Sequence, residues 1–344
     1  MSEVVLVTGG AGFIGSNLVA YLLRVRPDWR IVCFDKLTYA GNLANLRGTE
    51  GNPQFSFVRG DAASCDEVRA LFSRDRFTLV FHLAAETHVD RSIRDVAPFV
   101  RANFQGTAVM LDAARTAGVA RFLYVSTDEV YGSTPAGSDE CFDESSPLKP
   151  RNPYSATKAA ADLLCQSYIA TYEMPVVIAR PTNNYGPYQF PEKFLPLMIT
   201  NLTEERPIPI YGSGQNLRDW LYVEDTCRAL LMIAEDARPG SVYNVAGNQL
   251  LPNVELARRV VALMGRGPEM LRTVKDRPGH DFCYRLSGER IGRELGFTPS
   301  VALDEGLSRV IAWYRENEKW WREIKSGEYL NYYREQYPEI ADEG

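Results

Sequence analysis

The chain has 344 residues, of which 45% are hydrophobic and 24% charged, a composition typical of globular proteins and enough for one large or two modest domains. Its 38 basic and 44 acidic side chains give a formal charge of −6, which offers no positive surface for a nucleic acid or an anionic membrane. No stretch resembles a signal peptide or a membrane span, so we expect a cytoplasmic protein without nucleic-acid or membrane partners.

Up to about residue 180, short β-branched apolar runs alternate with longer amphipathic segments. Strands that are covered on both faces, and the helices that connect them, give this pattern. We therefore predict an α/β fold with a doubly wound parallel Rossmann sheet. The predicted strands cover residues 4–7, 31–34, 55–58, 79–83, 122–125 and 176–179, and the predicted helices cover 14–24, 65–72, 100–117 and 155–172.

Beyond Pro181 the alternation is lost and prolines become frequent. This change predicts a first domain over residues 1–187 and a smaller C-terminal α/β domain, mainly over 188–344, with a segment near 217–245 returning to the first. Because no flexible linker separates the two parts, we expect them to pack closely and to leave a cleft between them.

The segment TGGAGFIG follows the first predicted strand and opens a helix. Its glycines fit two spacings, G-x-G-x-x-G from Gly10 and G-x-x-G-x-x-G from Gly9, and either lets backbone N–H groups approach a pyrophosphate at the helix N-terminus. Asp35 ends the second strand 20 residues after Gly15, where an acid binds ribose hydroxyls and repels a 2′-phosphate. We therefore predict NAD rather than NADP as cofactor, although Lys36 stands beside the acid.

Two further motifs suggest chemistry on a sugar. Tyr154 and Lys158 in YSATK share one helix face, and an ammonium together with a nicotinamide cation favours the phenolate, which can deprotonate a hydroxyl. Thr127, Asp128 and Glu129 follow the fifth strand, at the sheet edge where open α/β folds bind ligands. We predict that Thr127 hydrogen-bonds the reacting oxygen and that the two carboxyl groups serve as an acid and a base.

With these motifs the chain resembles the extended short-chain dehydrogenases/reductases, and more closely the nucleotide-sugar 4,6-dehydratases of the dTDP-glucose type. The resemblance covers nearly the whole length. It rests on TGGAGFIG, DKLTYAGN, HLAAETHVDRSI, STDEVYG, YSATK, NNYGPYQFPEKFLPLMI, PIYGSGQNLRDWLYVED and RPGHD.

The resemblance implies a lyase of deoxysugar synthesis that oxidises carbon 4 of an NDP-hexose, eliminates water across carbons 5 and 6 and returns the hydride to carbon 6. Tyr154 would take the 4-hydroxyl proton, Glu129 the carbon 5 proton, and Asp128 would protonate the leaving 6-hydroxyl. The resemblance also implies a homodimer formed through two helices of the first domain, near residues 100–117 and 155–172.

By the same resemblance, the first domain binds NAD and the second binds the nucleotide sugar. The implied cofactor residues are Gly9, Gly12, Phe13, Ile14, Gly15, Asp35, Lys36, Thr38, Asp61, Ala62, Leu83, Ala84, Ala85, Tyr154 and Lys158. The implied substrate residues are Thr87, Asn183, Asn184, Lys193, Pro209, Tyr211, Arg218, Asn253, Arg277, His280 and Tyr284, with Arg218 on the diphosphate.

Departures from the family pattern leave the substrate open. The segments ARPT at 179–182 and FCYR at 282–285 differ from the usual residues near the nucleotide and the sugar. The same chemistry on a UDP-sugar, or a nucleotide-sugar 4-epimerase, therefore stay as alternatives, although the epimerases of this family carry small residues in place of the Asp128–Glu129 pair.

Neither the cysteines nor the histidines suggest a metal site. The six cysteines lie far apart without a C-x-x-C spacing, and we expect them to be buried, reduced thiols. The three histidines have no paired spacing, and His82, on a predicted strand, is expected to be a core residue.

Overall fold

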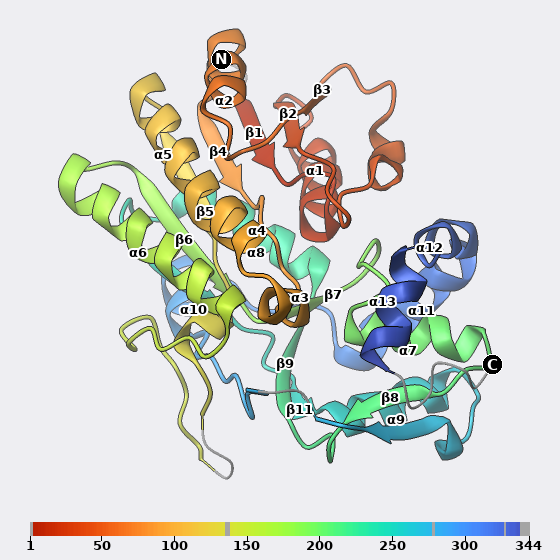
Figure 1. Ribbon diagram of the computed structural model, residues 1–344. Coiled ribbons are helices and arrows are strands. Elements are labelled where there is room, and N and C mark those ends of the chain that lie inside the picture. The colour runs from red at the N-terminus through yellow and green to blue at the C-terminus, as the bar shows by residue number, and fades with distance from the viewer. Residues whose placement is uncertain (1–2, 135–137, 277–278, 327, 338–344) are drawn as a thin grey trace.

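The computed structural model describes residues 3–134, 138–276, 279–326 and 328–337. Its centre is a seven-stranded sheet in the order β3-β2-β1-β4-β5-β6-β10, in which every pair of neighbours is parallel (Figure 1). This order is that of a dinucleotide-binding fold with one added strand, and the predicted fold class is confirmed. The strands are β1 (Val4–Thr8), β2 (Arg30–Asp35), β3 (Phe55–Arg59), β4 (Leu79–His82), β5 (Arg121–Val125), β6 (Val176–Pro181) and β10 (Val242–Val245).

Helices cover both faces of this sheet because successive strand residues point to opposite sides. Val5 and Val7 pack in one apolar cluster with α1 (Phe13–Val25) and α8 (Val223–Asp236). Leu6 packs in the cluster on the other face. That second cluster is built with α2 (Cys65–Arg74), α5 (Gly106–Ala117) and α6 (Pro153–Tyr172).

The remaining elements form a smaller unit beside the carboxyl edge of the sheet (Figure 1). One small sheet has the order β11-β9-β7 and another pairs β12 with β8. Their strands are β7 (Asn183–Tyr185), β8 (Ile208–Tyr211), β9 (Leu217–Tyr222), β11 (Leu250–Pro252) and β12 (Leu271–Val274). The helices packed with them are α7 (Phe194–Thr203), α9 (Asn253–Leu263), α11 (Leu303–Glu316), α12 (Glu318–Ile324) and α13 (Glu328–Gln336).

Short helical segments complete the chain. They are α3 (Val89–Arg94), α4 (Ala97–Phe99), α10 (Glu289–Leu295) and the 3-10 turns η1 (Leu43–Thr49), η3 (Asp128–Tyr131) and η4 (Pro268–Met270). Of the segment near 217–245, β9 lies in a small sheet, whereas α8 and β10 belong to the large one. The domain boundary at residue 187 stays a prediction.

The helix predicted over residues 100–117 is two segments, a π-helix η2 (Val100–Gln105) followed by α5. Within the π turn, the Asn103 amide accepts from Glu86 N at 2.8 Å and donates to Thr157 Oγ1 at 2.9 Å. It thereby joins the loop after β4 to α6. Apolar periodicity cannot show such a wide turn, which a buried tertiary contact stabilises.

The cysteine expectation was correct for four residues and wrong for two. Cys33, Cys165, Cys227 and Cys283 are buried, but Cys65 and Cys141 are exposed, and all six are free thiols. Cys65 opens α2 on its solvent side, where burial is not available.

His82 is the core residue that its strand position predicted. Its two ring nitrogens contact Thr8 Oγ1 at 2.7 Å and Thr107 Oγ1 at 3.1 Å, and burial lowers the pKa of the ring to about 3. In the described ranges, no helix combines the length and apolar character of a membrane crossing, and no three His, Cys, Asp or Glu residues are grouped as metal ligands.

Candidate active site

The glycine segment forms a tight turn between β1 and α1. Gly9 has φ 69°, and a Cβ on Gly15 would lie 2.1 Å from the Gly9 carbonyl oxygen, so both positions require glycine. Gly9, Gly12 and Gly15 line a pocket, whereas Gly10 lies against Cys33. Of the two spacings in the sequence, G-x-x-G-x-x-G is therefore the one that faces the pocket.

Asp35 and Asp61 make the far end of this pocket acidic. The Asp35 carboxylate accepts from the backbone N–H groups of Ala11 at 3.0 Å and Leu37 at 2.7 Å, although its burial raises its pKa. Lys36 pairs with Asp61 at 2.9 Å. Burial opposes ionisation of Asp61, but hydrogen bonds, the largest from Arg101, lower its pKa to about 2. The positive charge of Lys36 is thus compensated locally, and the pocket end suits ribose hydroxyls better than a 2′-phosphate.

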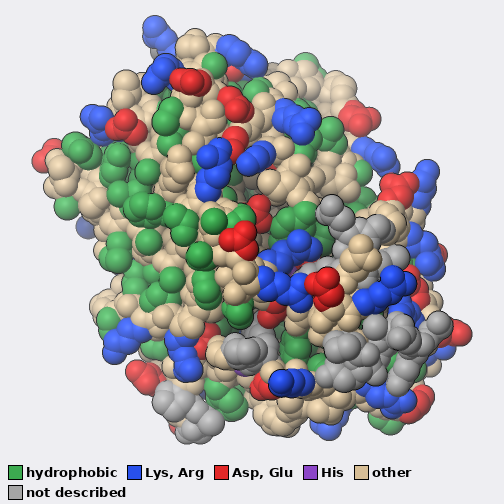
Figure 2. Space-filling model, in the orientation of Figure 1, with side chains coloured by type: hydrophobic (Ala, Val, Ile, Leu, Met, Phe, Trp, Pro, Cys, Tyr) green, Lys and Arg blue, Asp and Glu red, His purple; other side chains and the backbone are tan. Residues whose placement is uncertain are grey.

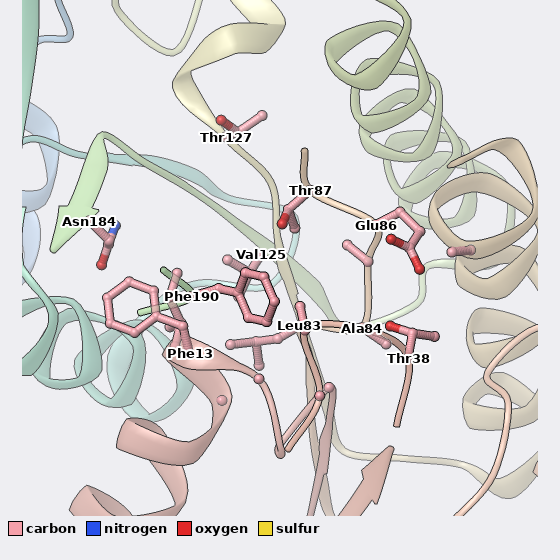
Figure 3. Close-up of a pocket in the computed structure, with 18 of the residues that line it drawn as sticks. Phe13, Thr38, Leu83, Ala84, Glu86, Thr87, Val125, Thr127, Asn184 and Phe190 are labelled. Carbon is pink, nitrogen blue, oxygen red and sulfur yellow. The ribbon is translucent and has the colours of Figure 1, made fainter. Parts of the chain in front are cut away.

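The pocket has a volume of about 320 Å³ and lies along the carboxyl ends of β1, β2, β4 and β5. Figure 3 shows Phe13 from α1 and Phe190, from the loop before α7, entering it from the same side, with Leu83 and Ala84 at its floor. All the cofactor and catalytic residues named from the sequence line it: Gly9, Gly12, Phe13, Ile14, Gly15, Asp35, Lys36, Thr38, Asp61, Ala62, Leu83, Ala84, Ala85, Thr127, Asp128, Glu129, Tyr154 and Lys158.

Tyr154 and Lys158 extend from the first turns of α6 into the pocket. The Lys158 ammonium donates to the Val125 carbonyl at 2.7 Å and lies 4.3 Å from the centre of the Tyr124 ring, and burial lowers its pKa to about 8. Burial, and next the Glu129 carboxylate, raise the pKa of Tyr154, whereas the Thr127 hydrogen bond lowers it. That Lys158 and a nicotinamide cation together favour the phenolate stays a prediction.

Thr127, Asp128 and Glu129 begin the 3-10 turn η3, directly after β5. The Thr127 hydroxyl donates to Asp128 Oδ1 at 3.1 Å and also hydrogen-bonds Tyr154. Burial, and then the charge of Glu129, raise the pKa of Asp128 to about 8, so this carboxyl group is protonated at neutral pH. Glu129 is only partly buried. Two adjacent carboxyl groups thus meet different environments, as an acid and base pair requires.

A second pocket continues from the first toward the smaller unit. Thr87, Glu129, Asn183, Asn184 and Lys193 line both. Figure 3 shows two of these residues, Thr87 and Asn184, in the first pocket. The other substrate residues named from the sequence line the second pocket: Pro209, Tyr211, Arg218, Asn253, His280 and Tyr284. Arg277 lies outside the described residues.

Arg218 supplies a cation to the second pocket. Its guanidinium is held by the backbone carbonyls of Leu217 at 2.7 Å, Asp281 at 3.0 Å and Phe282 at 3.3 Å, and it lies 4.3 Å from the centre of the Tyr284 ring. These partners are neutral, so the positive charge is fixed in place without being cancelled. Such a group suits a phosphate.

Several buried polar atoms in these pockets lack a hydrogen-bond partner among the described residues. They include Ser126 Oγ, Asp128 Oδ2, Asn183 Oδ1 and Asn253 Oδ1. Buried polar groups in native proteins are nearly always paired, so atoms of this kind mark places where a ligand binds. Together with the glycine turn and Asp35, they fit a dinucleotide in the first pocket and a polar, phosphorylated ligand in the second.

The sequence did not single out Glu86, Asn152, Gln189, Phe190 or Glu192. Glu86 follows the fourth strand and could have been found by the rule that ligands bind at strand ends. The side chains from 189–192 come from a loop, which carries no periodic signal. Asn152 precedes the YSATK motif and reads from sequence only as a helix cap.

The chain matches the model of the NAD dependent epimerase/dehydratase family over residues 5–246. A dTDP-glucose 4,6-dehydratase from Streptomyces niveus is 47% identical over 326 residues, covering 94% of this chain and 96% of the relative. The structure of DesIV, a dTDP-glucose 4,6-dehydratase from Streptomyces venezuelae with NAD and TYD bound, is 44% identical with a TM-score of 0.90, covering 94% and 100% of the two chains. A UDP-glucose 4-epimerase from Thermus thermophilus in complex with NAD is 29% identical with a TM-score of 0.84, covering 92% and 100%.

The fold and the site define an NAD-dependent enzyme of the extended short-chain dehydrogenase/reductase type, with its cofactor pocket at the carboxyl edge of a parallel sheet. The chain belongs to the NAD dependent epimerase/dehydratase family, and its relatives at 40 to 47% identity include dTDP-glucose 4,6-dehydratases.

Replacing Gly15 by alanine should weaken NAD binding by at least about tenfold, equivalent to roughly 1.4 kcal/mol. The added Cβ would lie 2.1 Å from the Gly9 carbonyl oxygen and force the turn open. Calorimetric titration with NAD measures the change. Gly48→Ala is the control, since no atom lies within 4 Å of its added Cβ, and equal affinities of the two variants would contradict the proposed role of the turn.

Proposed function

We propose that the chain is a hydro-lyase that converts dTDP-glucose to dTDP-4-keto-6-deoxyglucose and uses NAD as a resident cofactor. The observation that carries this proposal is the pair formed by Asp128 and Glu129 beside Tyr154. A protonated, buried carboxyl group next to a partly buried one can complete an elimination. An epimerase, which only oxidises and reduces one carbon, has no need of such a pair.

Tyr154 is the base for the first step. Its hydroxyl is buried and hydrogen-bonded to Thr127, which can steer the 4-hydroxyl of the sugar to the same point. The first pocket would hold NAD, which would supply a hydride acceptor and donor and a positive ring charge that opposes the raised pKa of Tyr154. The Lys158 ammonium donates a hydrogen bond to the Val125 carbonyl and so connects α6 to the end of β5.

Asp128 and Glu129, the first two residues of η3, carry out the elimination. A ketone at carbon 4 acidifies the proton on carbon 5, which Glu129 removes. Asp128 gives its own proton to the 6-hydroxyl, which turns a poor leaving group into water. Asp128 and Tyr154 are buried, which limits the access of bulk water to these two groups during the proton transfers.

The second pocket supports a nucleoside diphosphate on the substrate. Arg218 is a buried cation, and Lys193 adds a second positive charge at the junction of the pockets. Pro209 and Tyr211 on β8 give an apolar wall for a base, with the Tyr211 and His280 rings 6.0 Å apart. We assign NAD to the large sheet and the nucleotide to the smaller unit on this basis.

Incubation with dTDP-glucose in deuterated water tests this function. We expect deuterium at carbon 5 and the alkali-induced absorbance of a 4-keto-6-deoxy sugar. Glu129→Gln should abolish that product while reduced nicotinamide still forms, since the amide cannot take a proton. Recovery of the galactose epimer would assign the chain to the epimerases. Turnover of UDP-glucose but not of dTDP-glucose would show that the substrate carries uracil instead of thymine.

The pKa of Asp128 predicts an alkaline limit to dehydration. Because burial raises this pKa to about 8, the carboxyl group can donate a proton below that pH and loses this ability as the pH rises through it. Single-turnover elimination at saturating substrate should therefore fall above about pH 8. Asp128→Asn should remove most of the activity together with this limb, and a wild-type rate that stays constant far above pH 8 would contradict the assignment.

A homodimer in the cytoplasm is the proposed state of the enzyme. Apolar side chains are exposed on adjacent helices of the large-sheet unit, and Figure 2 shows hydrophobic side chains gathered over this face. They include Val96 just before α4, Val100 and Phe104 on η2, and Leu163 on α6. The six free thiols support a reducing compartment.

The double variant Phe104→Glu/Leu163→Glu should be monomeric, because burying two new carboxylates in an interface without partners is unfavourable. Sedimentation velocity compares it with the wild-type dimer. Leu263→Glu is the control, because this side chain is 42% exposed but lies on α9, away from the patch. A monomeric wild type, or a dimeric double variant, would refute the proposed interface.

A further inference from the structure

Asn152 is the N-cap of α6, the helix that carries Tyr154 and Lys158. Its Oδ1 accepts from the Ser155 N–H at 2.8 Å, and the Ser155 hydroxyl oxygen accepts from the Asn152 backbone N–H at 3.3 Å, so that the two residues form a capping box. Asn152 is buried, with 9% of its surface exposed. The cap therefore has one fixed orientation.

In this orientation the side-chain NH₂ group of Asn152 faces η3. Since Oδ1 is committed to the helix N-terminus, the amide NH₂ must point away from it. Asn152 Nδ2 donates to Glu129 Oε2 at 3.2 Å. A single side chain thus joins the helix of Tyr154 to the carboxylate that follows β5.

We propose that Asn152 is a positioning residue for Glu129, the base of the elimination, and holds its carboxylate at a fixed distance from Tyr154. This inference rests on the dehydratase function proposed above and extends it. Glu129 lies on a short 3-10 turn, is partly buried and has a long, rotatable side chain. The neighbouring Asp128 carboxyl group interacts electrostatically with Glu129. The hydrogen bond from Asn152 Nδ2 to Glu129 Oε2 restricts the rotamers that the Glu129 side chain can adopt.

The Tyr154 and Glu129 functions act on adjacent carbons of one sugar, carbon 4 and carbon 5. Their separation has to match that spacing while the sugar stays in place between the two steps. The hydrogen bond from Asn152, the N-cap of α6, to Glu129 connects the helix of Tyr154 directly to Glu129. It therefore sets the distance between Tyr154 and Glu129 without relying on the sheet.

Two substitutions separate this role from that of a helix cap. Serine and aspartate both cap helices about as well as asparagine. Asn152→Ser keeps an acceptor for Ser155 N–H but has no NH₂ for Glu129. Asn152→Asp also keeps the acceptor, strengthens the helix terminus through its charge, and places a second carboxylate against Glu129.

The experiment measures two signals in the full-length, NAD-loaded protein with dTDP-glucose. One is the single-turnover absorbance of reduced nicotinamide, which reports oxidation at carbon 4. The other is solvent deuterium entering carbon 5, which reports proton removal by Glu129. Thermal unfolding of each variant is recorded beside them.

In Asn152→Ser we expect carbon 5 exchange and kcat to fall by about 10- to 100-fold, the loss typical of a misplaced catalytic group, while KM and nicotinamide reduction change by less than about twofold. Reduced nicotinamide should therefore accumulate. Asn152→Asp should lose exchange at least as strongly, because its carboxylate repels Glu129 instead of donating a hydrogen bond to it.

Ser155→Ala is the matched control, since it breaks the reciprocal half of the capping box and leaves the bond from Asn152 to Glu129 in place. It should lower the unfolding temperature without changing the ratio of exchange to nicotinamide reduction. Wild-type exchange in Asn152→Ser, or an equal loss of both signals, would overturn the proposal. A wild-type protein that shows no exchange at all would instead refute the dehydratase function itself.

Discussion

The parallel direction of all seven strands is the constraint on which the rest of this structure depends. Because every strand runs the same way, the residues that follow β1, β2, β4 and β5 meet at one edge, although they are far apart in the sequence. Parallel strands require crossover helices, and those helices bury both faces of the sheet. The carboxyl edge is left as the place where polar side chains can gather around a ligand.

Burial then divides the chemistry among these polar groups. Asp128 and Glu129 are adjacent in sequence, but the first is buried with one unpartnered oxygen and the second faces both pockets. The same low-polarity surroundings raise the pKa of Tyr154 and lower that of Lys158. The charge states are therefore properties of the packed site rather than of the residue types.

Hydrogen bonds between elements fix the geometry of the site. Asn103 in the π turn connects the loop after β4 to α6, and Asn152 connects α6 to Glu129. Carbonyl groups around Arg218 hold its guanidinium in the lining of the second pocket. Each of these contacts uses an amide or a carbonyl group, so the positions of the charged groups are set without neutralising them.

The sequence by itself determined the parallel sheet, the glycine turn, Asp35 and the order of the YSATK and TDE motifs, because each depends on local periodicity or on a residue that only one backbone geometry requires. The site residues that it named line two joined pockets, apart from Arg277, which lies outside the described residues. Only the tertiary structure decided which glycine spacing faces the pocket, where the helix over 100–117 changes to a π turn, and which groups Lys158 and Asn152 contact. These outcomes depend on distances between segments that are remote in the chain, and on burial, neither of which a linear pattern encodes.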